Sequence, residues 1–291
     1  MNNFERDIQP VLNLFKTKDF KKAELFCKQL LNLYPQYIWL YNFLGIVLTE
    51  QNKINEAIIY YEKGLKIDPK YSMIYNNLGS AYQLQKKYSK AESNFKKSIE
   101  LDNKLPEHHN NLGNFYRVIN KDKKAINSYK NAIKIKSNFF PSHYNLGITY
   151  KNLGNLNKAK WHLKESIKFN LKLYPAHRAL SEITKYKPDN QHLKLLNKIY
   201  ENKISTNKKE LIYALGKAYE DIKNFTKSFN FYNEANKLHR KTINYNKNIE
   251  TNEFRKIKEI FTVKLLKKFD KSGNKNYKII FILGMPRSGT T

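Results

Sequence analysis

Apolar and small residues return along most of this chain with a period of 34 residues. A Leu-Gly pair recurs at 44–45, 78–79, 112–113 and 146–147. Leu or Tyr stands three residues after each Gly, Ala stands twelve after it, and a large apolar residue stands sixteen after it. The Leu, the Gly and the residue three after the Gly share one face of a helix. Four independent columns with one period therefore predict a helical repeat.

This pattern resembles the tetratricopeptide repeat, in which each unit is a helix–turn–helix. The resemblance implies an all-α, superhelical solenoid. The recurring Gly and Ala would let two helix backbones approach closely, and the large residue would fill the groove beside them. Each hairpin keeps an apolar face that only a neighbouring hairpin can bury, so the units are expected to stack.

The frame extends in both directions with departures. Residues 4–37 look like a degenerate first repeat, in which Pro10 stands where Leu is expected. Downstream, Leu180 keeps its column, but Lys187-Pro188 is expected to break the second helix. Leu215-Gly216 then restores the pattern.

These departures divide the chain into four parts. About five repeats are expected over 4–171, followed by an irregular helical segment over 172–208. A repeat-like hairpin and an amphipathic connecting helix would fill 209–270, since apolar residues recur with helical spacing at 254–261. The last part, 277–291, does not follow the repeat pattern.

One column of the repeat is polar. Asn77, Asn111 and Asn145 each immediately precede a Leu-Gly, while Phe43 holds that place in the first regular repeat. The column resembles the asparagine ladder that lines the concave groove of some tetratricopeptide-repeat proteins and bonds to an extended peptide. An amide can donate and accept, so it can pair with any peptide unit. The alternative is that these residues serve packing or local capping.

The chain ends on an apolar run, Tyr277 to Leu283, followed by the loop "GMPRSGTT". Gly284 and Gly289 keep the spacing of a nucleotide-binding P-loop, but Thr290 stands at the position of its Lys. Without that Lys, ordinary ATP or GTP hydrolysis is disfavoured. Backbone N–H groups and hydroxyls could still hold a phosphate.

The strand and loop resemble the start of an α/β sulfotransferase domain that uses 3′-phosphoadenosine 5′-phosphosulfate (PAPS), closest to the tyrosylprotein sulfotransferases. The resemblance implies that Arg287 neutralises the transferred sulfuryl group without a catalytic metal. It also implies that the 5′-phosphate is held by Ser288, Gly289, Thr290 and Thr291. A hydroxyl would be the acceptor, with protein tyrosine as one candidate, and the repeats would bind the acceptor peptide or protein. The general base would lie beyond Thr291, so the chain is expected to be incomplete and inactive alone. The alternatives are a chance match at a chain end and a non-enzymatic scaffold that binds proteins.

Composition changes this picture little. The net charge is +29, but lysines occur along the whole chain, and Lys, Asn and Ile share A/T-rich codons. Charge alone therefore does not predict a specific nucleic-acid partner. Cys27 is the only cysteine, and neither a signal peptide nor a membrane-spanning run is present, which favours the cytoplasm. The histidines lack zinc-site spacing. His109 and His143 share a column with Tyr41 and Tyr75, which predicts groove or packing residues.

Overall fold

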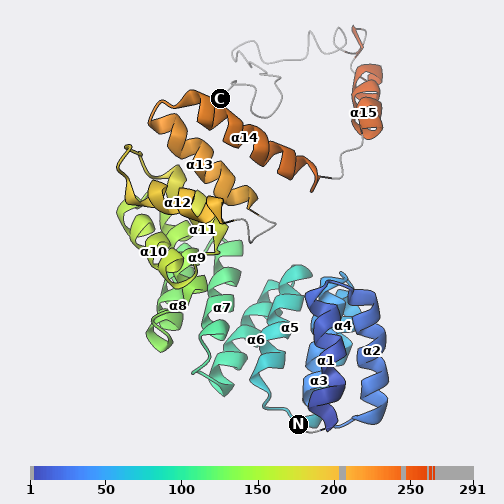
Figure 1. Cartoon of the computed structure of the whole chain (residues 1–291). Coiled ribbons are helices and arrows are strands. Elements are labelled where there is room, and N and C mark those ends of the chain that lie inside the picture. Colours follow the sequence, from blue (N-terminus) through green and yellow to red (C-terminus); the bar gives the residue numbers. More distant parts are fainter. Residues whose placement is uncertain (1–2, 203–207, 244–246, 261, 264, 266–291) are drawn as a thin grey trace, which may run out of the picture. The chain divides into compact units, whose positions relative to one another are not determined.

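The computed structural model describes residues 3–202, 208–243, 247–260, 262–263 and 265 (Figure 1). It forms two compact units, Met1–Lys237 and Leu238–Thr291. The described residues contain helices and turns, without a strand. The helices of the first unit are α1 (Asn3–Lys16), α2 (Phe20–Leu33), α3 (Ile38–Glu50), α4 (Ile54–Ile67), α5 (Ser72–Leu84), α6 (Tyr88–Leu101), α7 (Pro106–Val118), α8 (Asp122–Ile135), α9 (Phe140–Asn152), α10 (Leu156–Phe169), α11 (Tyr174–Glu182), α12 (Gln191–Glu201) and α13 (Lys209–Asp221). Helix α14 (Phe225–Arg240) reaches into the second unit, which also holds α15 (Lys247–Ile260).

The predicted all-helical solenoid is confirmed. From α1 to α10 the helices form hairpins, each with a first and a second helix of one repeat. Second helices pack against the first helix of the next repeat, and the first helices α3, α5, α7 and α9 also contact one another in succession. The predicted strand and loop of 277–291 lie outside the described residues.

Each hairpin closes by placing a large side chain over the recurring Gly. A Cβ atom added to Gly113 would lie 2.5 Å from Cε1 of Tyr129, and one on Gly79 would lie 2.7 Å from Phe95. Tyr129 and Phe95 are almost fully buried. Real Cβ atoms do not approach a ring this closely, so the pattern of Gly and large apolar residues reports direct contact between the two helices.

The turn between the two helices of a repeat has one residue in the left-handed region. This residue has φ of 62° at Lys18, Asn52 and Lys223, 59° at Lys86 and 56° at Asn120, and Gly154 has φ of 74°. The backbone N–H of the next residue then bonds to a carbonyl of the first helix, as Lys87 does to Tyr82 at 2.9 Å. This geometry ends the first helix and reverses the chain.

Pro188 explains why the sixth unit departs from the others. It occupies the left-handed turn position of the frame, and the proline ring fixes φ near −65°, so the tight turn cannot form there. Helix α11 instead ends at Glu182, and α12 begins at Gln191. The break predicted in the second helix is therefore wrong. The break falls in the turn, and α12 forms beyond it.

Candidate functional site

The asparagines singled out from the sequence lie between successive first helices. Nδ2 of Asn77 on α5 donates to Oδ1 of Asn42 on α3 at 2.8 Å. The same bond runs from Asn111 to Asn76 at 3.2 Å and from Asn145 to Asn110 at 3.0 Å. Together these six residues, Asn42, Asn76, Asn77, Asn110, Asn111 and Asn145, form what we call the asparagine ladder. It links α3, α5, α7 and α9 through side-chain amides.

Half of the ladder was missed by sequence reasoning. Asn42, Asn76 and Asn110 are buried and accept the bonds from the next repeat. Their signal was present, because Asn recurs at these positions with the repeat period, one residue before the column that was noticed. The pairing itself joins residues 35 apart, which only the stacking of neighbouring repeats can reveal.

The outer members of the ladder retain unused hydrogen-bonding capacity. Asn77 and Asn111 are half-buried, and Asn145 is buried with 9% exposure. Each of the three uses one N–H on its partner, leaving a second. Within the described part of the chain, no protein donor bonds to Oδ1 of Asn77. Asn77 on α5 can therefore still donate to and accept from a bound molecule. Oδ1 of Asn111 on α7 accepts from Nδ2 of Asn110 at 3.5 Å, which leaves it a second lone pair.

The column shared by Tyr and His has a structural role. The hydroxyl of Tyr41 donates to the carbonyl of Pro35 at 3.0 Å, and that of Tyr75 donates to Pro69 at 3.1 Å. His143 and His177 bond in the same way to Ser137 and Leu171, at 3.0 and 3.1 Å. Each side chain reaches back six residues and fastens the turn between two repeats.

His109 departs from this arrangement. Its neighbour His108 makes the corresponding contact, to the carbonyl of Asp102 at 3.3 Å. His109 instead lines a hollow between α6, α7 and α8. The two histidines predicted as groove or packing residues therefore differ in role. His143 fastens a turn, and His109 faces a hollow.

Two pairs of histidines have tautomers fixed by their partners. Nε2 of His177 must donate to the Leu171 carbonyl, so its Nδ1 accepts from Nε2 of His192 at 3.0 Å. His192 in turn accepts from the Tyr186 hydroxyl at 2.7 Å. His143 likewise leaves Nδ1 to accept from Nδ1 of His162 at 3.2 Å. Protonating an accepting ring nitrogen would place two hydrogen-bond donors opposite each other.

These histidines predict a stability loss in acid. Burial lowers the pKa of His162 and His177 to about 4 and that of His192 to about 3. An unfolded His has a pKa of about 6.5. Because the folded pKa is the lower one, folding favours the neutral ring, and its contribution is complete above the unfolded value. The melting temperature should therefore fall as pH decreases from about 7 toward 4.

The measurement is thermal unfolding by circular dichroism across that pH range. Replacing one pair, as His177→Gln together with His192→Gln, should flatten the curve. A melting temperature that stays constant down to pH of about 5 would contradict the account, because carboxylates titrate mainly below that pH.

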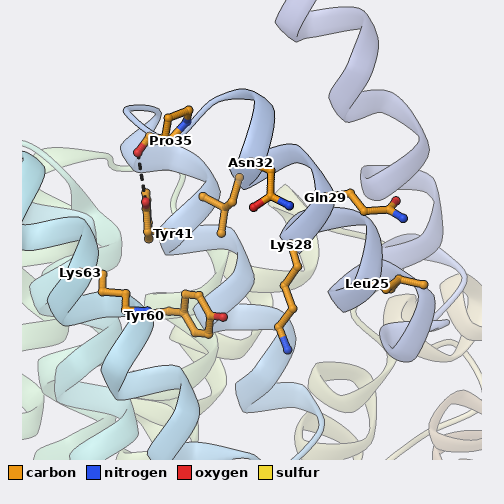
Figure 2. A pocket seen from close by; sticks show the side chains of 9 residues that line it. Leu25, Lys28, Gln29, Asn32, Pro35, Tyr41, Tyr60 and Lys63 are labelled. Carbon is orange, nitrogen blue, oxygen red and sulfur yellow. Dashed lines mark hydrogen bonds between the residues drawn. The ribbon is translucent and has the colours of Figure 1, made fainter.

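Hollows open on the second-helix side of the repeats. One of about 730 Å³ lies between α2, α3 and α4, where Lys28, Tyr60 and Tyr41 surround it (Figure 2). The Tyr41 to Pro35 bond closes its edge in the same view. The hollow of about 430 Å³ lined by His109 occupies the equivalent place two repeats later. Its wall includes Lys96, the repeat equivalent of Lys28.

The remaining features are metal-binding groups, membrane-spanning helices and the terminal loop. They contain no group of three or more His, Cys, Asp or Glu side chains that could hold a metal. Within the same ranges, no helix combines the length and hydrophobicity needed to span a bilayer. The residues proposed for PAPS, Arg287, Ser288, Gly289, Thr290 and Thr291, lie outside the described residues.

Comparisons with known proteins point to one repeat type. A model described as "TPR repeat" matches residues 45–86 and 113–154, and models described as "Tetratricopeptide repeat" match 72–105, 140–172 and 210–242. An uncharacterized protein of Aquifex aeolicus (strain VF5) is 34% identical over 79 residues, which are 27% of this chain and only 10% of that relative.

Two solved structures share the fold. A thermophilic TPR protein of Thermus thermophilus has a TM-score of 0.55 at 16% identity, covering 62% of this chain and 97% of its own. A tetratricopeptide repeat protein of Parabacteroides merdae ATCC 43184 has a TM-score of 0.53 at 16% identity, covering 86% of this chain and 96% of its own. At these identities the likeness concerns the fold alone.

Proposed function

Because the chain carries tetratricopeptide repeats, we propose that it is a protein-binding scaffold whose first helices hold an extended peptide segment. The observation that carries the proposal is the asparagine ladder, a row of three amide pairs that spans four successive first helices. The buried members hold the outer members in place, and the outer members keep capacity for a ligand. Preset amides of this kind lose little rotamer freedom on binding.

The ladder favours a partner recognised through its backbone. Each peptide unit offers one N–H and one carbonyl, which complement the oxygen and the remaining N–H of Asn77 and Asn111. Successive first helices repeat the same amide, so an extended chain can be held at several points. Affinity would then depend on backbone geometry, and neighbouring side chains would supply the preference for sequence.

A test begins with peptides selected from a random library on the immobilised chain, followed by fluorescence anisotropy. N-methylation of peptide bonds in the best binder should lower its affinity by about tenfold or more, because each lost N–H removes a bond to an asparagine oxygen. Replacing Asn77 and Asn111 by Ala should produce a similar loss. Replacing Asn94 and Asn157 by Ala, which lie on second helices, is the matched control and should change little.

Two outcomes would count against the proposal. Selection could yield no binder, or the binders could tolerate both N-methylation and the first-helix substitutions. The N-methylated peptide needs no protein variant, so it separates recognition from any stability loss caused by Ala.

A second candidate function rests on the terminal loop. We propose that the repeats belong to a PAPS-dependent sulfotransferase and present an acceptor hydroxyl to its catalytic part. Gly284 to Thr291 supply the motif for this, with Arg287 as the sulfuryl-neutralising residue. The test is sulfate transfer from PAPS by a gene product that extends past Thr291. Arg287→Ala should reduce transfer by about 10²-fold or more without changing helicity. Full activity in that variant would show that Arg287 does not have the proposed role. Absence of transfer by the unmodified gene product would contradict the sulfotransferase proposal itself.

A further inference from the structure

Positive charge is distributed unevenly along the repeats. Residues 4–103 contain 15 Lys and Arg against 11 Asp and Glu, whereas residues 104–172 contain 14 against 3. A preference for A/T-rich codons accounts for abundant lysine. It does not account for a local loss of Asp and Glu, whose codons accept A and T as well. The depletion of carboxylates in the fourth and fifth repeats therefore needs another cause.

The second helices of these repeats carry most of the excess. Seven of their lysines are exposed and Lys160 is half-buried: Lys123, Lys124, Lys130 and Lys134 on α8, and Lys158, Lys160, Lys164 and Lys168 on α10. Within the described ranges, Lys168 alone among them forms an ion pair, with Glu165 at 3.6 Å, while the charge of Lys124 helps to lower the pKa of Glu92. We call these eight residues the lysine surface.

Several of these lysines are held in place. The ammonium of Lys124 lies 5.4 Å from the ring centroid of Tyr116, and that of Lys158 lies 5.4 Å from Tyr150. Contacts of this kind order a long side chain before a partner arrives. Lysines of both helices also act on one residue. The positive charges of Lys130 on α8 and Lys158 on α10 both help to lower the pKa of His162.

Hollows lined by lysines and amides border the surface. Lys123 and Lys124 share the 430 Å³ hollow with Asn127 and Asn131. On the other side, Lys160 and Lys164 line a hollow of about 330 Å³ between α10, α11 and α12, together with Asn190 and Gln191. Each hollow thus offers ammonium groups for an anion beside uncharged side chains that can bond to a peptide backbone.

The side chains favour carboxylates over nucleic acid. Neither α8 nor α10 contains Arg, the residue suited to bidentate phosphate contacts. Single strands also need a series of free rings for base stacking. The exposed aromatic residues of the two helices are Trp161 and Phe169, and both already contact His143, with ring centroids 5.7 Å apart.

We propose that the lysine surface is a docking site for an acidic polypeptide segment, whose carboxylates pair with ammonium groups on α8 and α10. The site lies on second helices and recognises side-chain charge. It is therefore separate from the asparagine ladder, and the failure of either leaves the other standing.

The experiment measures binding of a labelled oligoglutamate peptide by fluorescence anisotropy at low ionic strength. The variant Lys123→Gln, Lys130→Gln, Lys160→Gln and Lys164→Gln should weaken binding by about tenfold, from the loss of several modest ion pairs. The matched control changes Lys63, Lys66, Lys70 and Lys87 to Gln. It removes the same charge from the second and third repeats and should weaken binding by no more than about twofold.

Three results of the binding measurements would overturn the proposal. Equal losses in the two variants would mean attraction to net charge alone, and no loss in the first would exclude α8 and α10. Tighter binding of a single-stranded oligonucleotide of equal charge, lost in the first variant, would assign the surface to nucleic acid.

Carbodiimide cross-linking of oligoglutamate to the unmodified chain tests the site without any variant. Cross-links should concentrate on lysines of α8 and α10, and an even spread along the chain would contradict the proposal.

Discussion

Replacing Tyr129 by Ala is expected to lower the free energy of unfolding by about 3–5 kcal/mol, the range typical of truncating a large aromatic side chain in a protein core to Ala. The ring is fully buried in the fourth repeat and lies directly against Gly113. Its removal would leave a cavity between α7 and α8. A solenoid depends on contacts between neighbours, so a weakened hairpin also weakens the repeats on both sides.

Chemical denaturation followed by circular dichroism measures this loss. Tyr129→Phe is the matched control, because Phe95 fills the same position one repeat earlier. That variant forfeits only the 2.8 Å bond from the hydroxyl to Oδ1 of Asn114, and it should cost about 1 kcal/mol. If Tyr129→Ala cost no more than Tyr129→Phe, the closed packing of the hairpin would be disproved.

Removing the ladder acceptor on α7, Asn110, should have the second largest effect. Oδ1 of Asn110 accepts from the Ser142 hydroxyl at 2.9 Å and from Nδ2 of Asn145 at 3.0 Å. All three residues are buried. Asn110→Ala would leave two buried donors unpaired, at about 1–3 kcal/mol each. The Ser142 hydroxyl can rotate toward another acceptor, so the expected loss is about 2–4 kcal/mol, in the lower part of the summed range.

A double-mutant cycle isolates this interaction. Combining Asn110→Ala with Ser142→Ala should cost less than the sum of the single changes, because the second substitution removes a donor that the first had orphaned. Asn127→Ala, at an exposed position on α8, is the surface control and should stay within about 0.5 kcal/mol of the parent chain. Strict additivity of Asn110 and Ser142 would mean that the bond from the Ser142 hydroxyl to Asn110 contributes nothing.

The repeat fold could be predicted because its determinants recur at one spacing. Gly113 and Tyr129 are both visible in the sequence, and their distance along the chain suits the two helices of one hairpin. The turn column was harder to recognise, because Lys and Asn occupy its left-handed position more often than Gly does. Pro188 was therefore assigned to a broken helix instead of an impossible turn.

The polar contacts could be predicted only in part. Asn77 was found because it precedes Leu-Gly, but its bond to Asn42 depends on the register between two neighbouring first helices. The bond from His143 to the Ser137 carbonyl depends on the path of a turn, which hydrophobic spacing does not encode. The lysine surface was hidden for another reason: lysines are common everywhere, and only the missing carboxylates distinguish it.

The most direct test of peptide binding by the first helices observes the ladder amides themselves. In ¹⁵N-labelled chain, the side-chain amide signals of Asn77 and Asn111 would be assigned and followed during titration with a library-selected peptide. These signals should shift in proportion to occupancy, while the amide signal of Asn157 on α10 should stay in place. If the peptide binds and the signals of Asn77 and Asn111 do not move, the first-helix amides do not contact it, and the asparagine ladder is not the peptide-binding site.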